Sequence, residues 1–144
     1  LAGLAHDMCK KMDDKSLIEL AKKDENPISE IELNKPALLH GRAAAVKIQS
    51  DFKITDPEII QAIANHTFGS PGLCDLAKAL YAADKIEPGR EQVSKEYYQC
   101  LFSMTFDKMI YTVALESVQY LTKKGKEINS ITMSFLEELK NKIK

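Results

Sequence analysis

Five titratable side chains are candidates for metal binding or catalysis, judged by their residue types and their positions on predicted helices. The three histidines of the chain and two of its aspartates qualify: His6, Asp7, His40, His66 and Asp84. Residues three, four, seven or eight positions apart share a face of a helix. His66 therefore shares the apolar face of Ile63, and Asp84 shares that of Leu80. An unpaired carboxylate on a buried face is costly, so we expect a cation or strong hydrogen-bond donors beside Asp84.

Two interpretations of these positions are open. Taken singly, a buried histidine is more often a hydrogen-bonded core residue than a ligand, and Asp84 alone could cap a backbone or pair with a lysine. Taken together, the five residues lie near the ends of four predicted helices and offer imidazole and carboxylate, which are ligands for iron, manganese or zinc. The absence of paired thiols disfavours a purely structural zinc. We therefore predict metal binding, although the spacing indicates neither the metal nor its role.

The elements that must position these residues are helices, because apolar residues recur at helical spacing and no sustained strict alternation occurs. We predict an all-α fold of about seven to eight helices. Start signals occur at Ser16 with Glu19, Asn34 with Pro36, Asp56 with Pro57, Ser94, and Asn129 or Ser130. The segment from Asn34 is expected to run to about Phe52, and Gly125 to end a long helix from about Phe106. Residues 1–144 are predicted to form one domain.

Composition excludes several classes of protein. The 144 residues are 44% hydrophobic and 28% charged, as in a folded globular domain rather than a disordered chain. With 20 basic and 21 acidic residues, the net charge of -1 favours neither a nucleic-acid nor an anionic-membrane partner. No apolar stretch approaches the roughly 20 residues of a membrane span, and no signal-peptide pattern occurs. Three cysteines without a CxxC pair favour a reducing compartment, and we predict a cytoplasmic protein.

The beginning of the sequence is abrupt. Residues 1–11, LAGLAHDMCKK, have a helical pattern, yet no capping residue and no turn precede them. We therefore expect an upstream piece, with an N-terminal helix missing from the chain.

Four blocks within residues 1–90 resemble a known family. LAGLAHDMCK, ALLHGRAAA, AIANHTFGSPG and YAADKIEPGR look, in this order, like blocks of the bacterial YqeK family, within the HD-domain superfamily of metal-dependent phosphohydrolases. The later stretch KKGKEINSIT resembles a degraded form of the last block of that family. An adjacent His-Asp pair alone is a weak signal, whereas NHTxGxPG followed by ADKIEPGR is specific. The resemblance implies an HD-type helical bundle that hydrolyses diadenosine tetraphosphate symmetrically to two ADP.

The resemblance also implies roles for individual residues. His6, Asp7 and Asp84 would ligate a divalent or trivalent metal ion, with a histidine that the family places one helix upstream and that this chain lacks. Iron is the first expectation, with manganese or zinc as alternatives. His40 and His66 would face the substrate phosphates or hold a second ion. Asp7, Lys10 and Arg90 would be catalytic, the two cations by pairing with phosphate oxygens.

The substrate contacts implied by the resemblance extend toward the C-terminus. They are Asp7, His40, His66, Thr67, Asp84, Arg90, Glu127, Ile128, Asn129, Ser130, Ile131 and Thr132. The family usually has His-Pro where this chain has Asn129 and Ser130, so the contacts of that stretch are the least secure.

Several nearby residues have simpler interpretations. Cys9 is expected to be a small buried thiol, and Lys85 a solvated charge at a helix end. Arg42 and Lys47 are given even weight as pocket residues. The tyrosines at 81, 97, 98, 111 and 120 are expected to contribute packing alone.

Two other functions stay open on the sequence. One is a nucleotidase or phosphatase acting on nucleoside mono- or diphosphates, and the other is a non-catalytic nucleotide-binding regulatory module. A homodimer is left open as well.

Overall fold

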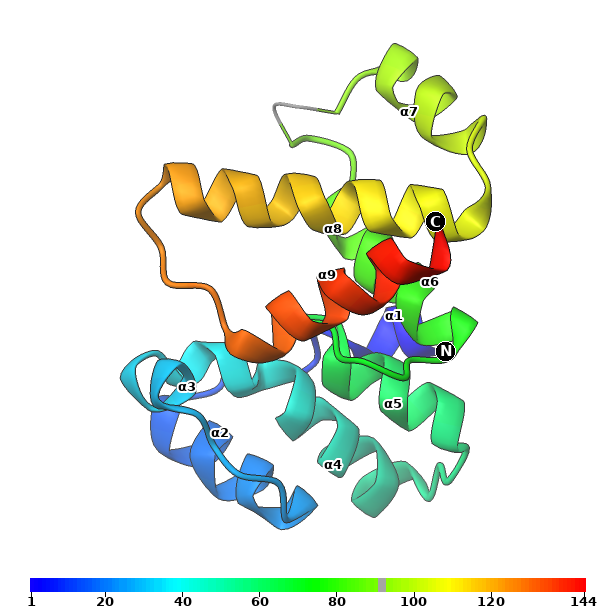
Figure 1. The fold of residues 1–144 in the computed structure, drawn as a ribbon. Coiled ribbons are helices and arrows are strands. Elements are labelled where there is room, and N and C mark those ends of the chain that lie inside the picture. The colour runs from blue at the N-terminus through cyan, green and yellow to red at the C-terminus, as the bar shows by residue number, and fades with distance from the viewer. Residues whose placement is uncertain (91–92) are drawn as a thin grey trace.

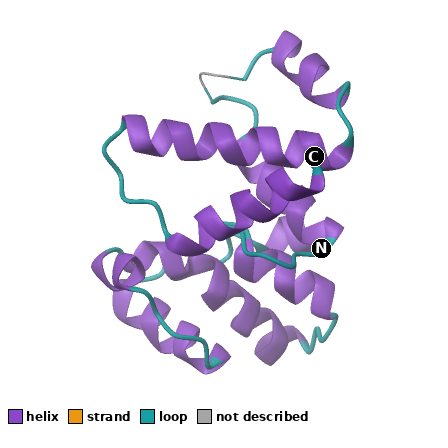
Figure 2. Ribbon diagram, in the orientation of Figure 1, coloured by secondary structure: helices purple, strands orange, loops and turns teal. Residues whose placement is uncertain are grey.

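The computed structural model describes residues 1–90 and 93–144 (Figure 1, Figure 2). All secondary structure within these ranges is helical, which confirms the all-α prediction. The helices of the described ranges are α1 (Ala2–Ala5), α2 (Asp14–Ala21), the 3-10 helix η1 (Lys22–Asp24), α3 (Glu30–Asn34), the 3-10 helix η2 (Pro36–Leu39), α4 (His40–Phe52), α5 (Pro57–Asn65), α6 (Asp75–Lys85), α7 (Lys95–Phe102), α8 (Phe106–Lys123) and α9 (Ser130–Lys142). The short α3, which the sequence did not predict, brings the α-helices of these ranges to nine.

Three of the predicted helix starts are confirmed by capping hydrogen bonds. The Asp56 carboxylate accepts from the backbone of the first turn of α5, and the Ser94 hydroxyl caps α7 in the same way. Asn129 rather than Ser130 caps α9, because its side-chain oxygen accepts from the backbone N–H of Ile131. Gly125 follows the end of α8 with φ of 66°, as its predicted role requires.

One of the other two predicted starts is wrong, and the second is confirmed in part. Helix α2 begins at Asp14, two residues before Ser16, and the Asp13 carboxylate caps it by accepting from the Ser16 backbone N–H at 3.0 Å. Asn34 ends α3, whose capping box is formed by Ser29 and Glu32. The next helical segment does open at Pro36, as η2, and continues into α4, which ends at Phe52 as predicted.

The N-terminal segment is helical over a shorter range than residues 1–11. Helix α1 ends at Ala5. Beyond it, backbone hydrogen bonds join residues three apart instead of four: the Met8 N–H donates to the Ala5 carbonyl, and the Lys10 N–H to the Asp7 carbonyl. Adjacent residues of a regular helix point about 100° apart. Since α1 ends at Ala5, before these two residues, the neighbouring side chains of His6 and Asp7 can face the same space.

Helices that lie near one another in the chain also pack together in space. Helix α2 packs on α4, α4 on α5, α5 on α6, α6 on α8, and α8 on α9. Figure 1 shows α2 to α5 in the lower half, α8 across the upper half, and α9 crossing between them. Helix α1 packs on α5, in the centre of the view. Among the described helices, none combines the length and apolarity that crossing a bilayer requires.

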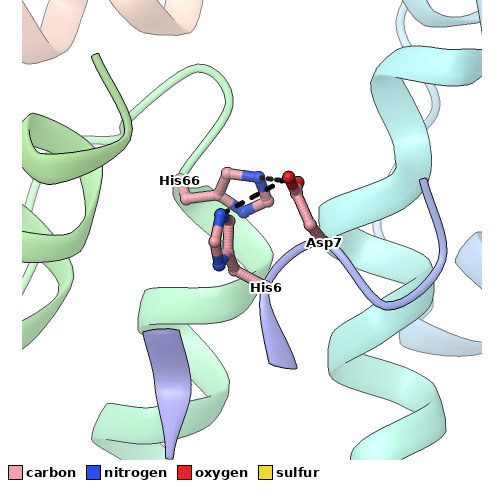
Figure 3. Close-up of side chains that lie close together, drawn as sticks. All are labelled: His6, Asp7 and His66. Carbon is pink, nitrogen blue, oxygen red and sulfur yellow. Dashed lines mark ion pairs between the residues drawn. The ribbon is translucent and has the colours of Figure 1, made fainter. Parts of the chain in front are cut away.

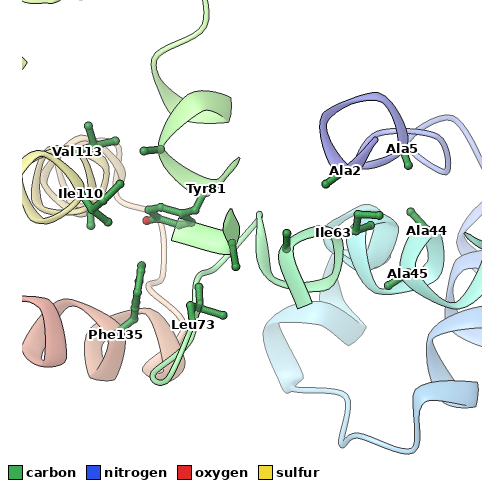
Figure 4. Packing of buried hydrophobic residues seen from close by; sticks show 14 of the residues in the cluster. Ala2, Ala5, Ala44, Ala45, Ile63, Leu73, Tyr81, Ile110, Val113 and Phe135 are labelled. Carbon is green, nitrogen blue, oxygen red and sulfur yellow. The ribbon is translucent and has the colours of Figure 1, made fainter. Parts of the chain in front are cut away.

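The buried core has an alanine-rich side and an aromatic side (Figure 4). The first lies between α1, α4 and α5 and includes Ala2, Ala5, Ala44, Ala45 and Ile63. The second lies between α6, α8 and α9 and includes Leu73, Tyr81, Ile110, Val113 and Phe135. Small side chains let helix backbones approach closely, so the alanine-rich side brings the ends of α1, α4 and α5 together.

Gly69 fixes the turn that follows α5. Its φ is 71°, a left-handed conformation, and its backbone N–H donates to the Asn65 carbonyl at 2.8 Å. A Cβ atom at this position would lie 2.3 Å from Cδ1 of Phe135 on α9. The turn after α5 can therefore pack against α9 only because residue 69 has no side chain.

We predict that Gly69→Ala destabilises the protein by roughly 2–4 kcal/mol, the sum of left-handed strain and overpacking against Phe135. Chemical denaturation followed by circular dichroism measures the change in the free energy of unfolding.

Gly125→Ala is the matched control, because Gly125 has φ of 66° but a Cβ there would meet no atom within 4 Å. The free energy of unfolding of this variant should fall only by the cost of left-handed backbone strain, about 1 kcal/mol. Equal losses in the two variants would show that Phe135 does not constrain the turn.

Candidate metal centre

The five residues selected from the sequence come together in one cluster. His6 and Asp7 follow α1, His40 begins α4, His66 follows α5, and Asp84 lies in the last turn of α6. The Asp7 Oδ1 atom lies 3.2 Å from His40 Nε2 and 3.7 Å from His66 Nε2. The Asp84 Oδ1 atom lies 3.9 Å from His6 Nε2. Figure 3 shows His6, Asp7 and His66 converging from α1 and α5.

Each imidazole is oriented by the backbone at the end of its own helical segment. The Nδ1 atom of each ring lies within hydrogen-bond distance of the carbonyl oxygen three residues earlier: Gly3 for His6 at 2.6 Å, Ala37 for His40 at 2.8 Å, and Ile63 for His66 at 2.8 Å. A carbonyl oxygen can only accept, so Nδ1 of each ring carries the hydrogen. Each neutral ring therefore directs the lone pair of Nε2 toward the cluster, as metal-ligating histidines do.

Two of these lone pairs oppose each other. The Nε2 atoms of His40 and His66 are 2.9 Å apart. With both Nδ1 atoms committed to carbonyls, neither neutral ring can donate to the other. The repulsion is relieved only by a proton on one ring or by a cation beside both. The Asp7 Oδ1 atom nearby is buried and makes no hydrogen bond of acceptable geometry, although it lies within ion-pair distance of both rings.

Burial determines which of these groups is charged. It lowers the pKa of His66, only 1% exposed, to about 4, and the electrostatic interaction with His40 acts in the same direction. His66 is therefore a neutral imidazole near pH 7. Burial alone would raise the pKa of Asp7, but the hydrogen bond from Lys10 and the charges of His6, Lys10 and His40 outweigh it and lower the pKa. Asp7 is accordingly a carboxylate.

The donor set fits a metal ion. His6, Asp7 and His66 each offer one ligand atom, and the three atoms lie within 4.8 Å of one another. Asp84 adds a second carboxylate beside His6. Neutral imidazole and carboxylate together suit zinc, iron or manganese. A cation would also satisfy the Asp7 oxygen and separate the opposed nitrogens of His40 and His66.

Lys85 has a role that the sequence interpretation missed. It was expected to be a solvated helix-end charge, but its side chain is only 14% exposed. Its Nζ atom donates to the His66 carbonyl at 2.9 Å and to Asp84 Oδ2 at 3.3 Å, and lies 4.0 Å from the centre of the Tyr81 ring. It thereby links the end of α5 to Asp84. The sequence analysis predicts a cation beside Asp84, but the helical periodicity does not identify Lys85 as that cation.

The predicted phosphate-binding residues lie at the edge of the cluster. Lys10 donates to Asp7 Oδ2 at 2.7 Å and is 59% exposed. Arg90 donates to the Asp84 backbone carbonyl at 2.8 Å and to Glu87 Oε1 at 3.0 Å, so it folds back toward the end of α6. The Thr67 hydroxyl oxygen is buried and has no hydrogen-bond partner in the described ranges.

The stretch from Glu127 to Thr132 reaches the turn after His66 through its last residue. The Thr132 hydroxyl donates to the Phe68 carbonyl at 2.8 Å. Asn129 caps α9 and its Nδ2 atom lies 3.4 Å from the Ser29 hydroxyl. Glu127, Ser130 and Ile131 are exposed, and Ile128 is half-buried against the core.

Two cations considered for the pocket have other partners. Arg42 binds both carboxylate oxygens of Asp24 at 2.8 Å and also reaches Glu32, so it ties the segment after α2 to α4. Lys47 pairs with Asp51 on its own helix. Cys9 is fully buried, as expected, and burial raises the pKa of its thiol.

Comparisons with known proteins find relatives that match most of the chain. A symmetrical bis(5'-nucleosyl)-tetraphosphatase of Staphylococcus aureus is 28% identical over 141 residues, which cover 94% of this chain and 71% of that protein. The protein of the same description from Bacillus subtilis is 26% identical over 128 residues, or 89% of this chain and 68% of the other.

A crystal structure of a Clostridium acetobutylicum protein, described as a predicted HD superfamily hydrolase involved in NAD metabolism, superposes with a TM-score of 0.85. It is 27% identical, and the match covers 98% of this chain and 75% of that one. The sequence profile of the HD domain matches residues 1–89, which contain all five residues of the cluster. This chain therefore belongs to the HD domain family.

Proposed function

We propose that this protein is a metal-dependent phosphohydrolase that cuts diadenosine tetraphosphate symmetrically into two ADP. The observation that carries the proposal is the convergence of three imidazole Nε2 atoms and two carboxylates, with the nitrogens of His40 and His66 opposed at 2.9 Å. The relatives from Staphylococcus aureus and Bacillus subtilis are named for that activity, and each matches most of this chain.

We assign the ligand role to His6, Asp7, Asp84 and His66, with His40 at the side of the site that faces the phosphates. Iron is our first expectation for the ion, and manganese or zinc suits the same donors. When bound, such an ion would polarise phosphoryl oxygens and lower the pKa of a water molecule.

The residues of the chain supply the remaining requirements of phosphoryl transfer, which are positioning and charge stabilisation. Lys10 keeps Asp7 ionised and places a mobile positive charge at the edge of the cluster. Arg90, 41% exposed, presents a planar guanidinium that can pair with two phosphate oxygens. Lys85 orients Asp84 from the opposite side. The Thr67 hydroxyl and the stretch from Glu127 to Thr132 are assigned to the bound nucleotide.

We also infer that residues 1–144 act as one domain and that the protein is cytoplasmic, because its three cysteines are all free thiols. Homodimer formation stays a prediction.

Product analysis tests the proposed function. Purified protein supplied with manganese or ferrous ion should convert diadenosine tetraphosphate to ADP alone, measured by anion-exchange chromatography. Equal amounts of AMP and ATP would contradict a symmetrical cut. Faster release of phosphate from AMP or dGDP would indicate a nucleotidase, and the absence of both metal and turnover would indicate a binding module.

Asp84→Asn should reduce bound metal well below one ion per chain and lower the hydrolysis rate by about 100-fold or more, because a neutral amide replaces a ligating carboxylate. Metal analysis and initial rates measure the two effects.

Asp75→Asn removes a carboxylate from the same helix, where Asp75 is 82% exposed and pairs only with Lys78 among the described residues. This control should keep metal and activity, and both variants should retain the native circular dichroism spectrum. Full metal occupancy in Asp84→Asn would refute the ligand assignment.

Gly41→Ala should displace His66, because a Cβ at this position would lie 2.9 Å from its Cε1 atom and 2.9 Å from the Ile63 carbonyl oxygen. We expect metal affinity to fall by about tenfold or more. Gly3→Ala, whose Cβ would meet nothing within 4 Å, adds the same methyl group beside His6 and should bind metal normally. Metal titration against a competing chelator separates the two, and equal affinities would show that α4 does not set the position of His66.

A further inference from the structure

A second recess lies beside the metal centre, between α6, α7 and α8. Its volume is about 880 Å³, and its lining comes from the end of α6, the 86–90 turn, Tyr97 of α7 and one face of α8. Sites for small molecules and cofactors typically enclose about 300–1,000 Å³. The recess, which we call the α8 cleft, is therefore large enough for a nucleotide.

The α8 cleft begins where the metal centre ends. Lys85 lines the cleft, and its Nζ atom lies 3.3 Å from Asp84 Oδ2 of the cluster. Arg90 also lines the cleft, and it donates to the Asp84 backbone carbonyl. A ligand that reaches the metal centre past these two cations would continue directly into the cleft.

The charge of the cleft suits a polyanion. Among the described residues, four cations line it, Lys85, Arg90, Lys123 and Lys124, against the single carboxylate of Glu116. The Tyr97 hydroxyl donates to that carboxylate at 2.5 Å, so part of its charge is already satisfied. The ion pairs of the described residues engage Lys85 and Arg90 but include neither Lys123 nor Lys124. Two exposed ammonium groups thus stand together at the C-terminal end of α8.

An aromatic ring lies next to these two lysines. Tyr120 lines the cleft, is 59% exposed, and has the Lys124 Nζ atom 5.6 Å from its ring centre. An exposed ring in a positively charged groove is a surface on which a nucleobase can stack. The cleft therefore offers cations for phosphates and, farther from the metal centre, a ring for a base.

We propose that the α8 cleft binds the second nucleoside diphosphate half of the substrate, with its phosphates on Lys123 and Lys124 and its base on Tyr120. This inference rests on the proposed function, because a symmetrical cut of a dinucleoside tetraphosphate requires places for two ADP units. The stretch from Glu127 to Thr132 is assigned to one of them. The cleft adjoins the cluster through Lys85 and Arg90, and we assign the other unit to it.

The double substitution Lys123→Gln/Lys124→Gln tests the phosphate contacts. We expect the KM for diadenosine tetraphosphate to rise by about tenfold while kcat changes less than about twofold, because the lost charges bind the substrate away from the reacting phosphorus. Lys108→Gln/Lys140→Gln removes the same charge from α8 and α9 outside the cleft and should leave KM unchanged.

Tyr120→Ala and Tyr120→Phe test the stacking surface. The alanine variant should raise KM severalfold, whereas the phenylalanine variant keeps the ring and should behave as the native protein. Native KM in both Tyr120→Ala and the Lys123→Gln/Lys124→Gln variant would overturn the inference while leaving the hydrolase proposal intact.

A binding measurement separates the two proposals. Equilibrium dialysis of diadenosine tetraphosphate against protein held in a chelator reports affinity without turnover. Weaker binding by the Lys123→Gln/Lys124→Gln variant than by the native protein supports the cleft even if the protein proves to hydrolyse another substrate. Equal binding by the two proteins overturns it, whatever the native protein hydrolyses.

Discussion

The hydrogen bond from each histidine Nδ1 to a backbone carbonyl is the constraint on which the site depends. These bonds determine the tautomer of all three rings and aim every Nε2 lone pair at one small volume. Two of the lone pairs are held 2.9 Å apart, an arrangement that only a proton or a cation makes favourable. Binding energy for a positive ion is therefore built into the backbone as well as into the carboxylates of Asp7 and Asp84.

The packing of the helices holds those three carbonyl groups in fixed positions relative to one another. Since each ring is tied to the end of its own helical segment, the cluster forms only where the ends of α1, α4 and α5 meet. Alanines on α1 and α4, and the absence of a side chain at Gly41, allow that approach. From the other side, Lys85 bonds to the His66 carbonyl and Phe135 of α9 packs on the turn at Gly69. The position of His66 is thus fixed by α1 and α4 on one side and by α6 and α9 on the other.

The sequence identifies the five residues of the cluster, but it predicts less well the helix ends and the buried partners that surround them. Helical spacing correctly predicts the burial of His66, but the face predicted for Asp84 is only partly buried, because Leu76 on that face is 41% exposed. It does not reveal that α1 ends at Ala5, since neither glycine nor proline follows there to mark the end of a helix. The sequence places Lys85 in solvent and gives Arg42 even weight as a pocket residue, yet both side chains are largely buried and have partners distant in the sequence, His66 for Lys85 and Asp24 for Arg42. The predicted cap at Ser16 is wrong because Asp13 caps α2 from upstream, and Asn34 ends α3 instead of capping the segment that begins at Pro36.

Chemistry and selectivity are encoded in different parts of the chain. The HD domain match ends at residue 89, and every residue of the metal centre precedes that point. Most of the lining of the α8 cleft follows it, from Arg90 to Lys124. A cluster of imidazoles and carboxylates can act on many phosphoanhydrides, because it contacts only the atoms near the bond that breaks. What distinguishes one nucleotide from another lies farther from that bond, so under the proposed function substrate choice would come from the surfaces that α8 and α9 add beside the cluster.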